Sequence, residues 1–186
     1  IGGVGLIKNY TKMITMDFKE IDNLVLVVGK TEGHLDQTLF ARNILDEKNG
    51  PPPEINLFNE KNNGETLLKL IENNLIKSAH DVSLGGIITA VAKMCIKGKK
   101  GINLNKPKYL INEMEYFFGE DQGRYIIEVN KKDLKKVIDL LKKNAVHFDE
   151  LGTINENELY IDDKTKVTID ELTSSNTKWL SNYMSN

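Results

Sequence analysis

The stretch that most constrains the fold is residues 78–96, which read SAHDVSLGGIITAVAKMCI. It has the pattern of a short strand end, a polar turn with two glycines, and a helix with apolar residues at three- and four-residue spacing. This pattern predicts a strand-to-helix junction, which belongs to a fold that mixes strands and helices. The apolar positions that define the helix are Leu84, Ile87, Ile88, Val91 and Cys95.

Two interpretations of this junction are open. The first N–H groups of a helix lack intrahelical partners, and glycines allow a ligand to approach the main chain closely. Asp81, just before the turn, would then lie beside a bound phosphate, with a magnesium ion bridging the two negative groups. In the other interpretation, Gly85 and Gly86 only let the helix pack closely on its sheet.

Composition narrows the class of protein. A chain of 186 residues is long enough for one domain with a hydrophobic core, or for one domain with a short appendage. The net charge of -2 and the absence of a basic run argue against a nucleic-acid partner. No apolar stretch approaches the roughly 20 residues of a membrane span, and the first residues lack the features of a signal peptide. The single Cys95 fits a small core residue in a reducing cytoplasm.

Strands are predicted at several points along the chain. The run at residues 24–28, LVLVV, predicts a central strand covered on both faces and ended by Gly29. Residues 124–130 alternate as a half-exposed strand does. Residues 102–104 predict a short strand, and two or three more fit between residues 146 and 167. With the helices, these strands predict an α+β fold (an α/β sandwich), in which helices flank a mixed sheet of about four to six strands.

We expect residues 1–23 to form a leading or linker segment and residues 24–186 to form the domain.

Helices are predicted by apolar spacing and by capping residues. The predicted helices are residues 37–47 with Leu39, Phe40, Ile44 and Leu45 inward; 65–74 with Leu67, Leu68, Ile71 and Leu75 on one face; a short helix within 107–118; one capped by Asn130 with Leu134, Val137, Ile138 and Leu141; and a last one that starts at the Thr168–Glu171 capping box and carries Leu172, Trp179, Leu180 and Tyr183.

A second polar constellation lies at residues 117–124, FFGEDQGR. Two carboxylates, an amide and a guanidinium fall within five residues just before a predicted strand. Polar groups this dense at a strand entrance form either a ligand-binding rim or a solvated turn with a salt bridge. Both interpretations are open from the spacing alone.

The three histidines do not indicate a catalytic pair. His34 falls in a loop and His147 in a strand-like segment, while His80 either orients a ligand or finishes a strand. The chain has no nucleophile elbow, HExxH, CxxC or GxGxxG motif. By its residues alone it therefore lacks a self-contained catalytic apparatus.

The two constellations together resemble a known family. Residues 80–86, HDVSLGG, followed by residues 118–124, FGEDQGR, are similar to the carboxyl-terminal domain of the phosphoribosylformylglycinamidine synthase family, in its large synthetase subunit. Flanking segments resemble the same family over essentially the whole chain. The Pro-Pro-Pro loop at residues 51–53 and the last segment, residues 179–184, look most like the bacterial form with small, separate subunits. The flanking segments are residues 1–7, 16–19, 33–35, 50–53 and 179–184.

The resemblance implies that the chain is one domain of an ATP-dependent ligase of purine synthesis, cytoplasmic and inactive in isolation. That family converts formylglycinamide ribonucleotide to formylglycinamidine ribonucleotide with ATP and with ammonia from glutamine. It implies Mg²⁺ and ATP or ADP as cofactors of the intact enzyme. The partners it implies are the upstream domains of the same subunit, a glutamine amidotransferase subunit, a small bridging subunit and small-molecule nucleotides.

The resemblance also implies roles for particular residues. Asp81 matches a magnesium ligand, and Glu120, Asp121 and Gln122 match a substrate-binding Glu-Ser-Gln triplet. In this copy of the domain these positions should face a related pseudo-site that keeps an auxiliary nucleotide in some family members. The residues expected to line this interdomain cleft with Asp81 are Ser83, Gly85, Gly86, Glu120, Asp121, Gln122 and Arg124.

Two positions depart from the family pattern. Leu84 stands where an acidic residue is usual, and Asp121 stands where a small serine is usual. Both changes disfavour tight phosphate binding, because one removes a metal partner and the other adds negative charge. Two alternatives therefore stay open: a sibling of the superfamily, such as the aminoimidazole ribonucleotide, selenophosphate or hydrogenase-maturation synthetases, or a non-catalytic docking scaffold.

Overall fold

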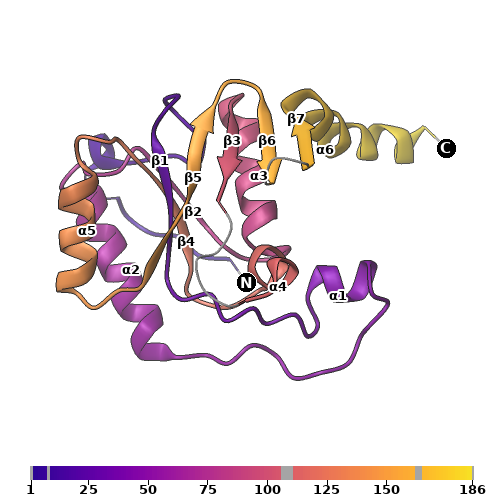
Figure 1. Cartoon of the computed structure of the whole chain (residues 1–186), viewed down its shortest axis with the longest axis horizontal. Helices are drawn as coiled ribbons and strands as arrows, with labels where there is room; N and C mark the ends of the chain where they lie inside the picture. Colours follow the sequence, from indigo (N-terminus) through magenta and orange to yellow (C-terminus); the bar gives the residue numbers. More distant parts are fainter. Residues whose placement is uncertain (1, 8, 106–110, 162–164, 186) are drawn as a thin grey trace.

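A mixed β-sheet with helices on both faces forms the body of the protein (Figure 1). The computed structural model describes residues 2–7, 9–105, 111–161 and 165–185. Over these residues the sheet has seven strands in the order β2-β4-β1-β5-β3-β6-β7. Neighbouring strands are antiparallel except for the parallel pair β3 and β6. The predicted α+β class is confirmed, with one strand more than the expected four to six.

Several of the strands have only four residues, and a period-2 pattern over four residues does not fix the number of strands. The strands are β1 (Leu24–Val28), β2 (Ser78–Asp81), β3 (Gly101–Leu104), β4 (Tyr125–Val129), β5 (Phe148–Asn155), β6 (Glu158–Ile161) and β7 (Thr165–Thr168). The helices are the 3-10 turn η1 (Tyr10–Lys12), α1 (Leu39–Asn43), α2 (Leu57–Glu72), α3 (Gly86–Gly98), α4 (Glu113–Phe118), α5 (Leu134–Lys143) and α6 (Ile169–Met184).

Strand β1 divides the interior into two cores. Val25 and Val27 belong to the core that faces α3, α4 and the start of α6, whereas Leu26 and Val28 belong to the core under α2 and α5. Successive strand residues point to opposite faces, so a strand buried on both sides needs apolar residues at every position. The predicted central strand covered on both faces is confirmed.

Two helix predictions are wrong in detail. Helix α1 covers only Leu39–Asn43, and Leu39, Ile44 and Leu45 are exposed rather than inward-facing. Apolar spacing does not reveal whether a face meets this chain's own core or solvent. Helix α2 starts eight residues before the predicted 65, because Asn56 caps it by accepting a hydrogen bond from the Asn59 N–H at 3.0 Å.

Three smaller corrections concern single residues. Leu68 is exposed, and Leu70 instead fills the α2 core. Asp133, rather than Asn130, stands at the N-cap of α5. The predicted short helix within 107–118 is α4, and residues 107–110 lie outside the described residues. The capping box at the start of α6 is confirmed, with Thr168 Oγ1 accepting from the Glu171 N–H at 3.2 Å.

Strand β4 is not half-exposed as its alternation predicted. It lies between β2 and β1, and Glu128, one residue before its end, is fully buried. The Glu128 carboxylate accepts hydrogen bonds from the backbone N–H groups of Lys19 (2.8 Å) and Glu20 (3.0 Å). It also accepts from Asn23 Nδ2 at 2.7 Å and Ser78 Oγ at 3.0 Å. A charged residue in the alternation therefore marks an internal clamp, not a solvent-facing position.

The clamp attaches the segment before β1 to the sheet. Phe18, next to the clamped N–H groups, is 1% exposed and packs in the α3 core. The division of the chain at residue 23 stays a prediction, but Phe18 and Asn23 are buried together with the sheet. Segment 18–23 thus contributes to the core before the first strand begins.

We predict that Glu128→Ala destabilises the fold by about 3 kcal/mol, because four donors lose a buried, charged acceptor. Urea unfolding measures the loss, and hydrogen exchange should show faster exchange at the Lys19 and Glu20 amides. The matched control is Glu156→Ala, since Glu156 is exposed. A loss equal to that of the control would contradict the clamp.

Candidate functional site

The residues predicted for the site lie around one end of the sheet. Asp81, at the end of β2, pairs with Tyr125 at the start of β4, and the Val82 N–H donates to the Arg124 carbonyl at 2.9 Å. A cavity of about 330 Å³, here called the turn pocket, opens beside this pair. It is lined by Glu60, Asp81, Val82, Ser83, Leu84, Glu120, Gln122, Gly123, Arg124 and Tyr125. Asp81 and Arg124 thus share one wall.

The turn pocket carries negative potential on its α2 side. Burial raises the pKa of Tyr125, and the charges of Glu60 and Asp81 raise it further. The Asp81 side chain is 63% exposed, and one of its oxygens lies 3.1 Å from His80 Nδ1. Asp81 therefore presents an accessible carboxylate to the cavity, and His80 orients it.

Glu120 connects two helix starts. One oxygen, Oε1, accepts from the backbone N–H of Gly85 and from that of Leu39, each at 2.8 Å. Gly85 is the N-cap of α3, and Leu39 is the first residue of α1. The N–H group that a phosphate would use at Gly85 is therefore already bound to an internal anion.

Gly86, the second glycine of the junction, has a packing role. Gly86 has φ +69°, and a Cβ there would lie 2.7 Å from the carbonyl oxygens of Phe117 and Gly119. The Gly86 N–H donates to the Ser83 carbonyl at 3.0 Å. The start of α3 thus lies against the end of α4, whereas the packing interpretation of the Gly-Gly pair placed this close contact on the sheet.

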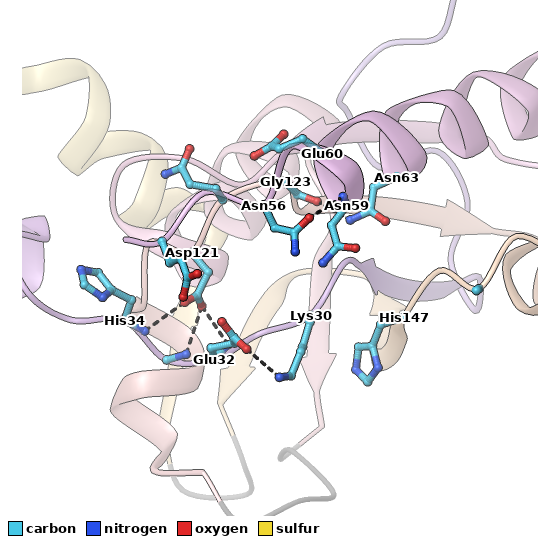
Figure 2. Close-up of a pocket in the computed structure, with 14 residues that line it drawn as sticks. Lys30, Glu32, His34, Asn56, Asn59, Glu60, Asn63, Asp121, Gly123 and His147 are labelled. Atoms are coloured by element: carbon cyan, nitrogen blue, oxygen red, sulfur yellow. Dashed lines mark hydrogen bonds and ion pairs between the residues drawn. The ribbon is translucent and has the colours of Figure 1, made fainter. Parts of the chain in front are cut away.

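Asp121 and Arg124 form a buried brace beneath the loop. Asp121 accepts from three successive backbone N–H groups, those of residues 32–34, at 3.1–3.2 Å (Figure 2). The guanidinium of Arg124 lies 3.5 Å from Asp121 and donates to Thr31 Oγ1 at 3.1 Å and to the Gly119 carbonyl at 2.6 Å. Arg124 is 1% exposed, so the guanidinium contacts the protein interior rather than the cleft. The negative charge of Asp121, expected to repel phosphate, is compensated internally.

The brace leaves Gln122 at the exposed tip of the loop. Gln122 and Gly123 line the turn pocket and also a larger cavity of about 510 Å³ on their other side. Gly29 permits this arrangement, because it has φ +98° and a Cβ there would lie 2.7 Å from the Gly123 carbonyl. The loop tip is therefore the partition between two cavities.

The larger cavity, here called the amide pocket, was not predicted from the sequence. It lies between the start of α2, the loop after β1, the α4–β4 loop and the turn before β5 (Figure 2). Its lining is Lys30, Glu32, Gly33, His34, Glu54, Asn56, Asn59, Glu60, Asn63, Asp121, Gln122, Gly123, Ala145 and His147. The one sequence signal was the Asn56, Asn59 and Asn63 spacing on a helix start, which apolar periodicity ignores.

The described residues contain no group of three or more His, Cys, Asp or Glu side chains that could hold a metal ion by themselves. Asp81, just before the turn, has an accessible carboxylate, and both glycine N–H groups have internal acceptors. The turn pocket can therefore supply one carboxylate and a few polar groups to a ligand, but no complete cage. In the part of the chain that the structure describes, no helix is long and apolar enough to cross a membrane.

The fold is that of an AIR synthase type domain. The family model described as "AIR synthase related protein, C-terminal domain" matches residues 20–164, and the chain belongs to this family. Over all 186 residues it is 72% identical to the phosphoribosylformylglycinamidine synthase subunit PurL of Pelagibacter ubique (strain HTCC1062). It covers 26% of that protein, so the chain spans about a quarter of the length of this curated relative.

Solved structures agree on the fold. Against T. maritima PurL complexed with FGAR the TM-score is 0.75 at 17% identity, over 88% of this chain and 30% of the other. Against T. maritima PurL complexed with ATP the TM-score is 0.66 at 14% identity, over 88% of this chain and 28% of the other. The hydrogenase maturation protein HypE of E. coli gives 0.56 at 16% identity, over 85% of this chain and 52% of that one.

We predict that Asp121→Asn destabilises the fold by about 2 kcal/mol, because the Arg124 charge loses its buried partner and one accepting oxygen becomes a donor. Chemical denaturation measures the loss, and exchange of the amides of residues 32–34 should accelerate. In the control, Glu32→Gln breaks the exposed ion pair with Lys30, which should change stability by less than about 1 kcal/mol. Equal effects of the two variants would refute the brace.

Proposed function

We propose that the chain is the carboxyl-terminal domain of a phosphoribosylformylglycinamidine synthase large subunit. The intact enzyme would convert formylglycinamide ribonucleotide, glutamine and ATP to formylglycinamidine ribonucleotide, and this domain alone would not turn over. The observation that carries the proposal is the 72% identity over the full chain to a protein of that name. A cytoplasmic location follows from the same proposal.

We propose that the turn pocket forms one wall of an interdomain cleft and meets a nucleotide or substrate there. Asp81, Ser83 and Gln122 are the exposed side chains that would contact the ligand. Glu120, Asp121 and Arg124 would act by holding the loop, because their charged groups contact the protein's own backbone. Gly85 and Gly86 would allow the turn between β2 and α3 to adopt its positive φ angles beside the cleft.

Magnesium fits this site only in a limited way. Mg²⁺ usually keeps several waters and binds through one or two carboxylates plus substrate phosphates. Asp81 would be the protein ligand, because its carboxylate is accessible. When bound, the ion would neutralise the phosphate charge beside Glu60 and Glu120. Nucleotides as cofactors are supported by the solved T. maritima PurL complexes with ATP, ADP and AMPPCP.

The proposed partners are the remaining domains of the longer polypeptide, a glutamine amidotransferase subunit and a small bridging subunit. The support is that this chain covers about a quarter of its relative and that a structure of PurLQS from T. maritima matches the fold with a TM-score of 0.63. Exposed apolar side chains at the end of α6, Trp179, Leu180 and Tyr183, would suit contacts with other polypeptide.

A docking scaffold is the second candidate, and one observation favours it. The Gly85 N–H group is bound to Glu120 and the Gly86 N–H group to Ser83, so neither is open to a phosphate. In that case the cleft would only seat a neighbouring domain. A sibling synthetase is less favoured, since the relative at 72% identity is a PurL and HypE matches in fold alone.

Replacing Asp81 by Ala in the intact polypeptide tests the proposal. We expect affinity for magnesium ADP, measured by equilibrium dialysis, to fall by about tenfold or more, because the metal loses its protein ligand. Ligase turnover is measured in parallel. Asp139→Ala is the control, because Asp139 is an exposed carboxylate on α5 outside the turn pocket. Unchanged affinity, turnover and stability in the Asp81 variant would favour the scaffold.

A further inference from the structure

The amide pocket has the size of a ligand site, and it shares Glu60, Gln122 and Gly123 with the turn pocket. Its volume of about 510 Å³ falls in the range of small-molecule sites. Four separate segments of the chain build it, and the brace of Asp121 and Arg124 fixes one of its walls. The brace therefore fixes one wall, while exposed side chains such as Glu54, Asn59 and His147 line the rest.

Asn63 shows what kind of group the pocket would accept. This residue is 7% exposed, and its Nδ2 donates to the Gly123 carbonyl at 2.9 Å (Figure 2). A carbonyl only accepts, so this bond fixes the amide with its oxygen away from Gly123. Among the described residues, Asn63 Oδ1 has no hydrogen-bond partner. Asn63 Oδ1 is not among the described side-chain atoms that are both fully buried and unpartnered, so it is an acceptor open to the pocket.

Asn59 provides a second acceptor on the same helix, α2. Its carboxamide points from α2 toward the side of the pocket that carries Lys30 and Glu32 (Figure 2). The side chain makes no hydrogen bond with any other described residue, whereas Asn56 is occupied in capping α2. Two free carboxamide oxygens therefore line the α2 wall.

The charged residues that line the amide pocket indicate whether its ligand is a cation or an anion. Lys30 is paired with Glu32 at 2.6 Å, and Asp121 is paired with Arg124. Glu54 and Glu60 have no ion-pair partner in the described part of the chain. Two uncompensated carboxylates disfavour an anion such as phosphate and favour a cation.

We infer that the amide pocket binds a small cationic nitrogen compound, an amine or a guanidine. Its N–H groups donate to the carboxamide oxygens of Asn59 and Asn63, and Glu54 and Glu60 balance its charge. This inference does not rest on the proposed ligase function, because the pocket is built by this chain alone.

Titration of the ¹⁵N-labelled 186-residue chain with agmatine, which carries an amine and a guanidinium, tests the inference by NMR at physiological salt. We expect saturable shifts at the side-chain amides of Asn59 and Asn63 and at the Gly123 amide. Inorganic phosphate should produce none of them. The double variant Glu54→Gln, Glu60→Gln should weaken agmatine binding about tenfold, since both opposite charges are lost.

The controls test each cavity by a residue that lines it alone, because Glu60 lines both cavities. Asp81→Asn removes a carboxylate from the turn pocket only and should leave agmatine affinity within about twofold, because that charge is screened by salt and solvent. Asn59→Ala removes a free carboxamide without touching the Asn63–Gly123 bond and should weaken binding. The inference is overturned if agmatine gives no saturable shift, if the double variant binds it equally well, or if phosphate binds in its place.

Discussion

The buried pair of Asp121 and Arg124 is the interaction on which both cavities depend. Its charges are satisfied by backbone groups from two sides, the N–H groups of residues 32–34 and the Gly119 carbonyl. Because a buried charge without a partner is strongly destabilising, the two loops must stay together. Gln122 and Gly123 are then fixed as the partition between the turn pocket and the amide pocket.

The same loop determines which side chains remain available to a ligand. Glu120 is occupied by the starts of α1 and α3, and it acts as an internal anion for the junction. Asp81 and Gln122 stay accessible at the rim of the turn pocket. The polar residues of this loop therefore have two roles. The buried or partly buried ones hold the loop in place, and the exposed ones face the cavity.

Glu128 plays a comparable part on the other side of β4. Its four hydrogen bonds attach the segment before β1 to the sheet and to β2. Phe18 is thereby placed in the α3 core. Exposed apolar side chains occur on α1 and at the end of α6, among other segments, and the end of α6 extends away from the sheet (Figure 1).

The sequence by itself determined the central strand β1, the α3 junction, the α6 capping box and the α+β class, because these depend on local periodicity and capping. It also identified the two polar segments that meet at the turn pocket. Only the tertiary structure decided that Arg124, Asp121 and Glu128 are buried, that Gly85 already has an internal acceptor, and that the asparagines of α2 line a second cavity. The reason is that burial and hydrogen-bond partners come from distant residues, such as Lys19 and Glu128, which are 109 positions apart, and local spacing carries no information about such contacts.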